Sequence, residues 1–186
     1  MNLTKITAIV LTKNEERNLE RCLNSLRFAD EILVVDDGSF DKTVSIAKKL
    51  GAKVIEHRLA EDYGAQRNFA MSKAANEWIL FIDADEEITE ELSEELKNIG
   101  RYLNTISGFF IRRRDYYMDR ELKYGETASI RNSGLLRLMK KGSGNWSGAV
   151  HEKFGLRGGT RTLKGFINHY PHQSLKEFIA AINYYS

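Results

Sequence analysis

The chain has 186 residues, of which 42% are hydrophobic and 29% are charged, an ordinary balance for a globular protein with its own core. Its single cysteine, Cys22, excludes an internal disulfide framework and is expected to be a small buried residue. No apolar run approaches the roughly 20 residues that a membrane-spanning helix needs, and the amino-terminus has no signal-peptide pattern. We therefore expect a cytoplasmic protein, free or at the inner face of the cytoplasmic membrane.

Charge is distributed unevenly between the two halves of the chain. Residues 1–100 carry 13 Lys and Arg against 20 Asp and Glu, whereas residues 101–186 carry 15 against 6. This asymmetry favours a cation bound to the first half and anionic groups near the second. A chance imbalance of solvated faces is the alternative.

The first hundred residues alternate between the patterns of strands and helices. Strands are predicted at 5–12, 31–39, 52–57 and 77–82, and helices at 15–28, 43–50, 64–75 and 90–99. Gly51 can end the second helix and Thr89 can cap the fourth. Such alternation predicts an α/β fold in which helices cover both faces of a mostly parallel sheet.

The second half has a different character, with strands and loops rich in aromatic residues, glycine and arginine. We expect 1–100 and 101–173 to be two halves of a single domain, the second with mixed α+β structure. A last helix is predicted at 174–186, where Ser174 and Glu177 have capping-box spacing. It either packs on the domain or lies on a membrane or a partner helix, and we expect packing.

Polar residues follow three of the predicted strands, namely Thr12–Asn14, Asp36–Asp37 and Asp83–Asp85. In open α/β sheets, ligands bind beyond the carboxyl ends of the parallel strands. We therefore expect these three segments to open onto one crevice.

The pair Asp83 and Asp85 follows the buried run "WILFI" directly. Residues i and i+2 of an extended chain point the same way, so the two carboxylates could face one point. Two like charges that close cost free energy unless a cation or a proton lies between them, and carboxylate oxygens suit Mg²⁺ or Mn²⁺. Glu86 and Glu87 are better explained as the acidic front of the following helix.

Asp36, Asp37 and Ser39 repeat this arrangement one strand earlier. A turn followed by a helix cap explains Asp37 and Ser39 as well as a ligand-binding site does. Asp36 is harder to explain in that way, because it directly follows the buried run "ILVV". A carboxylate in such a place commonly accepts hydrogen bonds from ribose hydroxyls or base N–H groups. The chain has neither G-x-G-x-x-G nor G-x-x-x-x-G-K-[ST], so neither a dinucleotide fold nor a P-loop is supported.

Four segments occur in order along residues 5–152, namely "IVLTKNEERNLERCLNSL", "ILVVDDGSFDKT", "GAQRNFAMSKAANEWILFIDADEEI" and "VHE". Together they resemble the family 2 glycosyltransferases, most closely the small bacterial members that act on lipopolysaccharide core. The resemblance implies the Rossmann-like GT-A fold, with an acceptor-binding half at 101–173. It also implies an enzyme that takes a sugar from a nucleoside-diphosphate sugar and inverts its anomeric centre.

The resemblance assigns roles to individual residues of the first half. Asp85 would be the direct ligand of the divalent metal, Mg²⁺ or Mn²⁺, with Asp83 shared between metal and ribose. The residues implied to line the nucleotide sugar are Thr12, Asn14, Glu15, one or both of Asp36 and Asp37, Arg67 and Asp83.

In the second half, Glu152 of "VHE" would be the catalytic base. Larger relatives have an acidic pair there and a later Q-x-x-R-W motif, whereas this chain has His151 before Glu152 and lacks that motif. Arg137, Trp146 and His151 are candidate contacts to the acceptor or the diphosphate, although core packing is the favoured explanation of Trp146.

Other basic residues of the second half have less specific patterns. Arg112–Arg114 and Arg131 could hold phosphate, or simply belong to solvated strand faces. His169 and His172 have no recognisable metal-ligand spacing, and we assign neither to a site.

We therefore expect a metal-dependent inverting glycosyltransferase that uses a nucleoside-diphosphate sugar, with UDP preferred. Its acceptor would be a glycan or glycolipid such as lipopolysaccharide core, and we expect no nucleic-acid partner. A metal-dependent nucleotidyltransferase is one alternative, but such enzymes usually have a basic, glycine-rich loop where this chain has "TKNEERN". A non-catalytic nucleotide-binding module is the other, and it would need no base.

Overall fold

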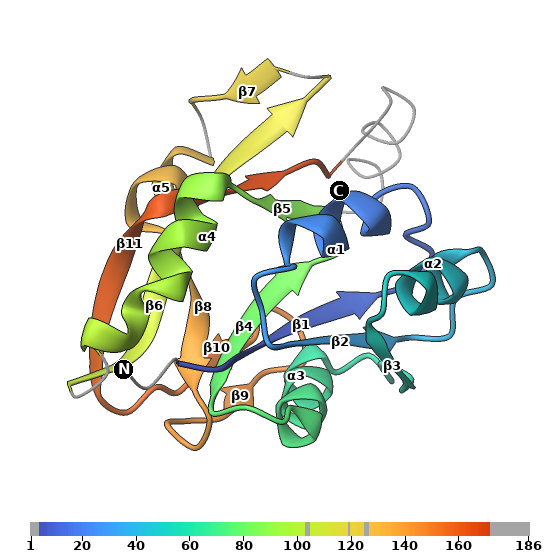
Figure 1. Ribbon diagram of the computed structural model, residues 1–186, viewed down its shortest axis with the longest axis horizontal. Helices are drawn as coiled ribbons and strands as arrows, with labels where there is room; N and C mark the ends of the chain where they lie inside the picture. Colours follow the sequence, from blue (N-terminus) through green and yellow to red (C-terminus); the bar gives the residue numbers. More distant parts are fainter. Residues whose placement is uncertain (1–3, 103–104, 119, 125–126, 172–186) are drawn as a thin grey trace.

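The computed structural model describes residues 4–171, apart from 103–104, 119 and 125–126. The predicted helix at 174–186 and His172 lie outside the described residues. A nine-stranded mixed sheet runs through the molecule and has helices on both faces (Figure 1).

The four strands and four helices predicted for the first hundred residues all form. In chain order the elements are β1 (Ile6–Thr12), α1 (Leu19–Ser25), β2 (Glu31–Asp36), α2 (Thr43–Lys49), β3 (Lys53–Glu56), α3 (Tyr63–Lys73), β4 (Trp78–Asp83), β5 (Glu86–Ile88) and α4 (Glu90–Lys97). Gly51 follows α2 with a φ of 82°, and the Thr89 hydroxyl accepts a hydrogen bond from the backbone N–H of Leu92 at the start of α4. Both predicted helix ends are thus confirmed.

The second half adds shorter helices and the remaining strands. They are η1 (Ile99–Tyr102), β6 (Ile106–Tyr117), β7 (Arg120–Leu122), α5 (Thr127–Ser133), β8 (Leu135–Lys140), β9 (Trp146–Ser147), β10 (Lys153–Phe154) and β11 (Gly159–His169).

The main sheet has the order β3-β2-β1-β4-β8-β6-β11-β5, with β7 paired to β6. The first four of these strands are parallel, as predicted. Strand β8 is antiparallel to both β4 and β6, and β11 is parallel to β6. Strands β6 and β11 therefore run in the same direction as β1 and β4, so their carboxyl ends reach the same edge of the sheet.

Two hydrophobic clusters hold the layers together, one on each face of the sheet. Helices α1, α2 and α4 cover one face, where Leu23, Ala47 and Leu92 are almost completely buried. Helix α3 and the β9–β10 hairpin lie against the other, where Phe81 is completely buried. Cys22 of α1 is also fully buried, which confirms the sequence prediction.

Strand β5 was not predicted, and the expectation that Glu86 and Glu87 begin the next helix is wrong. These residues pair with β11 instead, Glu86 opposite His169, and α4 begins at Glu90. The reason is that the Glu86 side chain is completely buried, where its carboxylate accepts hydrogen bonds from the backbone N–H of Asp83 and from Arg137.

None of the helices among the described residues has the length and apolar character that a membrane span requires.

Candidate active site

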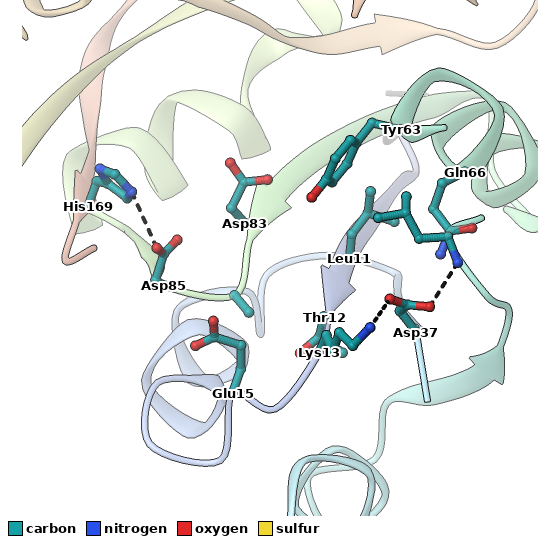
Figure 2. Close-up of a pocket in the computed structure, with 12 residues that line it drawn as sticks. Leu11, Thr12, Lys13, Glu15, Asp37, Tyr63, Gln66, Asp83, Asp85 and His169 are labelled. Atoms are coloured by element: carbon teal, nitrogen blue, oxygen red, sulfur yellow. Dashed lines mark hydrogen bonds and ion pairs between the residues drawn. The ribbon is translucent and has the colours of Figure 1, made fainter. Parts of the chain in front are cut away.

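A pocket of about 480 Å³ opens at the carboxyl ends of the parallel strands (Figure 2). Five of the residues that the sequence indicates line it, namely Thr12, Glu15, Asp37, Asp83 and Asp85. Strands β1, β2 and β4 are adjacent, so residues far apart in sequence meet at this edge. The expected crevice is therefore present.

Asn14 lies in the loop after β1 but does not line the pocket. It adopts a left-handed backbone conformation with a φ of 57°. Its backbone N–H donates to the Ser39 hydroxyl, and its side-chain oxygen accepts from the Phe40 backbone N–H, at 2.8 and 3.0 Å. Asn14 thus joins the loops after β1 and β2.

Asp36 and Asp37 are adjacent in sequence but point into different surroundings. Asp36 is buried, and its carboxylate accepts hydrogen bonds from the backbone N–H and the hydroxyl of Ser39 at 2.8 and 2.6 Å. Asp37 lines the pocket and accepts hydrogen bonds from Lys13 Nζ at 2.7 Å and from the Leu59 backbone N–H at 2.8 Å. Burial opposes the charge of Asp37, but these two donors outweigh burial and lower the pKa of the carboxyl group.

Asp83 ends β4 and faces two arginines. Arg137 Nη2 lies 2.7 Å from its Oδ2 atom, and Arg67 Nη2 lies 3.7 Å from its Oδ1 atom. Burial alone would raise the pKa of Asp83, but Arg137 and then Arg67 outweigh it and hold this pKa well below its ordinary value. Asp83 is therefore ionised at any physiological pH.

Asp85 lies beyond the end of β4, in a turn, so it does not continue the strand as the sequence argument assumed. Its carboxylate faces His169, whose Nε2 atom is 3.3 Å from Asp85 Oδ2 (Figure 2). The other ring nitrogen, Nδ1, is 2.5 Å from Oδ1 of Asp115 on β6. Burial lowers the pKa of His169, but the hydrogen bonds to Asp115 and Asp85 outweigh it and raise that pKa to about 9.

His169 lines the pocket, but the sequence analysis assigned it to no site, and it also missed Tyr63 and Gln66 of α3. His169 ends β11, and β11 runs in the same direction as β4. The rule that found the three acidic segments, a polar residue at the end of a parallel strand, would also have found His169 had β11 been predicted.

A second cavity, of about 440 Å³, contains the predicted base Glu152. Arg67 Nε donates to Glu152 Oε1 at 2.7 Å, and the same guanidinium group lies 5.0 Å from the centre of the Trp146 ring. Trp146 makes edge contacts with Phe81 and Phe154, so it both packs on the sheet and forms a wall of the cavity. Arg67 thus lies between Asp83 of the first pocket and Glu152 of the second.

The remaining candidates of the second half divide into those near the site and those away from it. Arg137 lines the second cavity and pairs with Asp83 and Glu86. His151 is exposed, has a φ of 55° and lines neither cavity.

Arg113 and Arg114 of β6 and Arg131 of α5 form ion pairs within the protein. Arg113 pairs with Glu86 and Asp115, and Arg114 and Arg131 both face Glu121. Because these three arginines already have carboxylate partners, the structure does not favour them as phosphate-binding residues.

The donor set of the first pocket fits a divalent cation. Asp85 offers carboxylate oxygen and His169 an imidazole nitrogen, ligands that Mn²⁺ accepts readily and Mg²⁺ tolerates. In the described part of the chain, no group of three or more His, Cys, Asp or Glu side chains is arranged to hold a metal alone. Further ligands would have to come from water or from a bound diphosphate, as is usual for Mg²⁺ sites.

A sheet of this topology with an acidic pocket at its carboxyl edge is that of the GT-A glycosyltransferases. The chain belongs to glycosyltransferase family 2, because the model of that family, Glycosyl transferase family 2, matches residues 7–155.

Curated relatives match almost the whole chain. An uncharacterised glycosyltransferase of Rickettsia typhi is 32% identical over 99% of this chain and 66% of its own length. The lipopolysaccharide core biosynthesis glycosyltransferase LpsC of Rhizobium meliloti is 31% identical over 97% of this chain and 68% of its own length. The chain thus spans about two thirds of the length of these relatives.

Solved structures of S. aureus TarS show the same fold. One in complex with UDP-GlcNAc superposes with a TM-score of 0.66 at 18% identity, over 94% of this chain and 61% of that one. In another, 60% of this chain matches 36% of that one at 30% identity, with a TM-score of 0.52.

Proposed function

We propose that the protein is an inverting glycosyltransferase that moves a sugar from a UDP-sugar to a glycan or glycolipid acceptor. The observation that carries this proposal is the position of Arg67, which contacts Asp83 in the acidic pocket and Glu152 in the adjoining cavity. Donor and acceptor sites must adjoin in this way for one sugar to pass between them. Binding of UDP-GlcNAc by TarS supports the choice of nucleotide, and LpsC supports lipopolysaccharide core as the acceptor.

The nucleotide would occupy the part of the pocket formed by the loops after β1 and β2. Asp37 has an ionised carboxylate facing this space and can accept hydrogen bonds from ribose hydroxyls or a base N–H. Thr12 and Glu15 line the same space. Asp36 is excluded from direct contact by its burial beneath Ser39, and so its role would be to shape the loop.

Asp85 and His169 would hold a divalent metal, with Asp83 beside them. The Asp83 oxygens already face Arg137 and Arg67, so Asp85 is the better direct ligand. The metal would act as a Lewis acid that neutralises charge on the departing diphosphate. Arg137 and Arg67 add positive charge next to the same place.

Glu152 would act as the general base toward the acceptor. An acceptor hydroxyl attacks the anomeric carbon from the face opposite UDP, the bond from that carbon to the phosphate oxygen breaks, and UDP leaves with the electron pair. The hydroxyl proton passes to the Glu152 carboxylate. Arg67 holds Glu152 through Nε and so fixes the direction of the carboxylate, while Trp146 and Phe154 exclude water from one side.

Replacing Glu152 by Gln tests this assignment. We expect sugar transfer to fall by about 10²- to 10⁴-fold, because the proton acceptor is lost. UDP affinity should stay close to that of the wild-type protein, since Glu152 lines the other cavity. The matched control is Glu121→Gln, which removes a partly buried, arginine-paired carboxylate outside both cavities.

The measurement is sugar transfer with a panel of UDP- and GDP-sugars, with the product anomer read by NMR and UDP affinity measured by calorimetry. Undiminished transfer by Glu152→Gln would remove Glu152 as the base. A product with retained configuration would contradict the inverting mechanism. UDP-sugar binding without transfer to any glycan would favour the non-catalytic module instead.

A further inference from the structure

A row of buried ion pairs continues behind the pocket, through residues that line neither cavity. From His169 it passes to Asp115, then to Arg113, and then to Glu86. The distances along it are 2.5 Å from His169 Nδ1 to Asp115 Oδ1, 2.9 Å from Arg113 Nη2 to Asp115 Oδ1, and 3.6 Å from Arg113 Nη1 to Glu86 Oε1. None of the three residues behind His169 lines the pocket.

Asp115 is the member of this row that touches His169. It is 3% exposed and lies on β6 directly opposite His169 in the parallel pairing with β11. Its backbone is therefore fixed by the sheet, and Arg113 of the same strand holds its carboxylate. A buried carboxylate held in this way is a rigid acceptor for the imidazole N–H.

We propose that Asp115 is a positioning residue of the metal site, which accepts the Nδ1–H of His169 so that Nε2 faces Asp85 and the pocket. This inference rests on the proposed function, in which Asp85 and His169 hold the metal. Because Asp115 holds the Nδ1–H, Nε2 is the ring nitrogen that faces Asp85 and that would give up its proton to bind a metal ion. Histidine ligands usually donate their second ring N–H to a carboxylate or carbonyl, and loss of that partner typically costs 10- to 100-fold in metal affinity.

The positioning role extends through Arg113 to Glu86, which is completely buried and also pairs with Arg137 Nη2 at 2.7 Å. Arg137 in turn pairs with Asp83. One supporting network thus reaches both pocket carboxylates, Asp85 through His169 and Asp83 through Arg137. A change at Asp115 should act on the metal first, because Asp115 contacts His169 directly and reaches Asp83 only through Arg113 and Glu86.

The test is the affinity of the whole chain for Mn²⁺ in the presence of saturating UDP, measured from the EPR signal of free Mn²⁺. We expect Asp115→Ala to weaken Mn²⁺ binding by about 10- to 100-fold. Asp115→Asn should lose less, because its amide oxygen can still accept the Nδ1–H in the same volume. UDP affinity without metal should be close to wild type in both variants.

Two further variants separate the explanations. Glu121→Gln removes a carboxylate that pairs with Arg114 and Arg131 but does not contact His169, and it should leave Mn²⁺ affinity unchanged. Wild-type Mn²⁺ affinity in Asp115→Ala, or an equal loss in Glu121→Gln, would overturn the proposal. If His169→Ala also binds Mn²⁺ normally, the metal site itself is wrongly assigned. If only His169→Ala binds Mn²⁺ weakly, the metal site stands and the role of Asp115 fails.

The Asp115→Asn variant keeps the proposal testable if Asp115→Ala does not fold. Should Asp115→Ala unfold because Arg113 loses its partner, the isosteric Asp115→Asn still gives a result. Mn²⁺ affinity between those of wild type and His169→Ala supports the proposal. An affinity equal to wild type, together with weakened binding in His169→Ala, contradicts it.

Discussion

At the scale of single residues, Asp36 and Asp37 illustrate how two adjacent acids lie in different environments. Asp36 faces inward, is 2% exposed and has two hydrogen bonds from Ser39. Asp37 faces the pocket and has Lys13 as its cationic partner. The sequence alone left open which of them contacts the nucleotide, since both follow a buried strand. Burial separates them and favours Asp37.

Isosteric substitutions should therefore have opposite effects at these two positions. Asp37→Asn is expected to weaken UDP binding by about 10- to 100-fold, the usual value of a hydrogen bond to a charged group, with a small change in stability. Asp36→Asn should cost about 1–3 kcal/mol of stability, because the buried amide N–H₂ would face the Ser39 donors, and leave UDP affinity near wild type. Calorimetry with UDP and urea denaturation check the pair, and the reverse pattern would refute the assignment.

His169 shows where residue-level prediction from sequence stops. Thr12, Asp83 and Asp85 could be placed at the site because each ends or follows an apolar run that reads plainly as a strand. His169 ends a strand, "GTRTLKGFINH", whose polar residues conceal its pattern. The contact of its ring with Asp115 depends on the pairing of β6 with β11, and no local pattern contains that information.

At the scale of elements, Glu31 connects β2 to three other segments at the amino-terminal edge of the sheet, namely β1, β3 and the segment after α3. From the start of β2, its carboxylate accepts hydrogen bonds from the Thr7 hydroxyl on β1 and from the Ala75 backbone N–H after α3, both at 2.7 Å. Lys53 of β3 lies 3.6 Å away. Burial alone would raise the pKa of Glu31, but the bonds from Ala75 and Thr7 outweigh burial and lower it.

Replacing Glu31 by Gln should cost about 1–2 kcal/mol of stability at neutral pH, because one acceptor oxygen becomes a donor. Since the pKa of Glu31 is lower in the folded protein, its stabilising effect is present above its ordinary pKa of 4.5 and is lost as pH falls through the folded value. The difference between wild type and variant should therefore shrink below that pH. Urea denaturation across this range measures it. Glu94→Gln, at an exposed pair with Lys97, should change stability by less than about 0.5 kcal/mol, and a pH-independent gap would contradict the argument.

The elements of the first half were predictable because each is a local unit. Strands β1, β2 and β4 are largely buried on both faces and read as apolar runs, and the helices repeat apolar residues at a period of 3.6. Strand β5 has only three residues, and its pairing partner β11 lies about eighty positions later in the chain. Within it Glu86 is buried and paired with Arg137, an environment that the acidic run "DEEI" does not indicate.

At the scale of the whole molecule, the two halves share one sheet. Strand β8 of the second half pairs directly with β4 of the first, and β11 returns to pair with β5. Leu80 on β4 and Leu138 on β8 are opposite each other and fully buried in one hydrophobic cluster. The two halves of opposite net charge therefore share a single core, and the acidic half supplies Asp83 and Asp85 while the basic half supplies Arg137.

A continuous sheet and core should unfold as one cooperative unit, and the chain has one tryptophan in each half to test this. Trp78 on β4 is buried, and Trp146 on β9 packs against Phe81 of β4. In Trp146→Phe the fluorescence reports the first half, and in Trp78→Phe it reports the second. Within each variant, the urea transition seen by fluorescence should coincide with that seen by far-UV circular dichroism, because neither half retains its core without the other. Separate transitions would instead show that residues 1–100 and 101–173 are independent folding units.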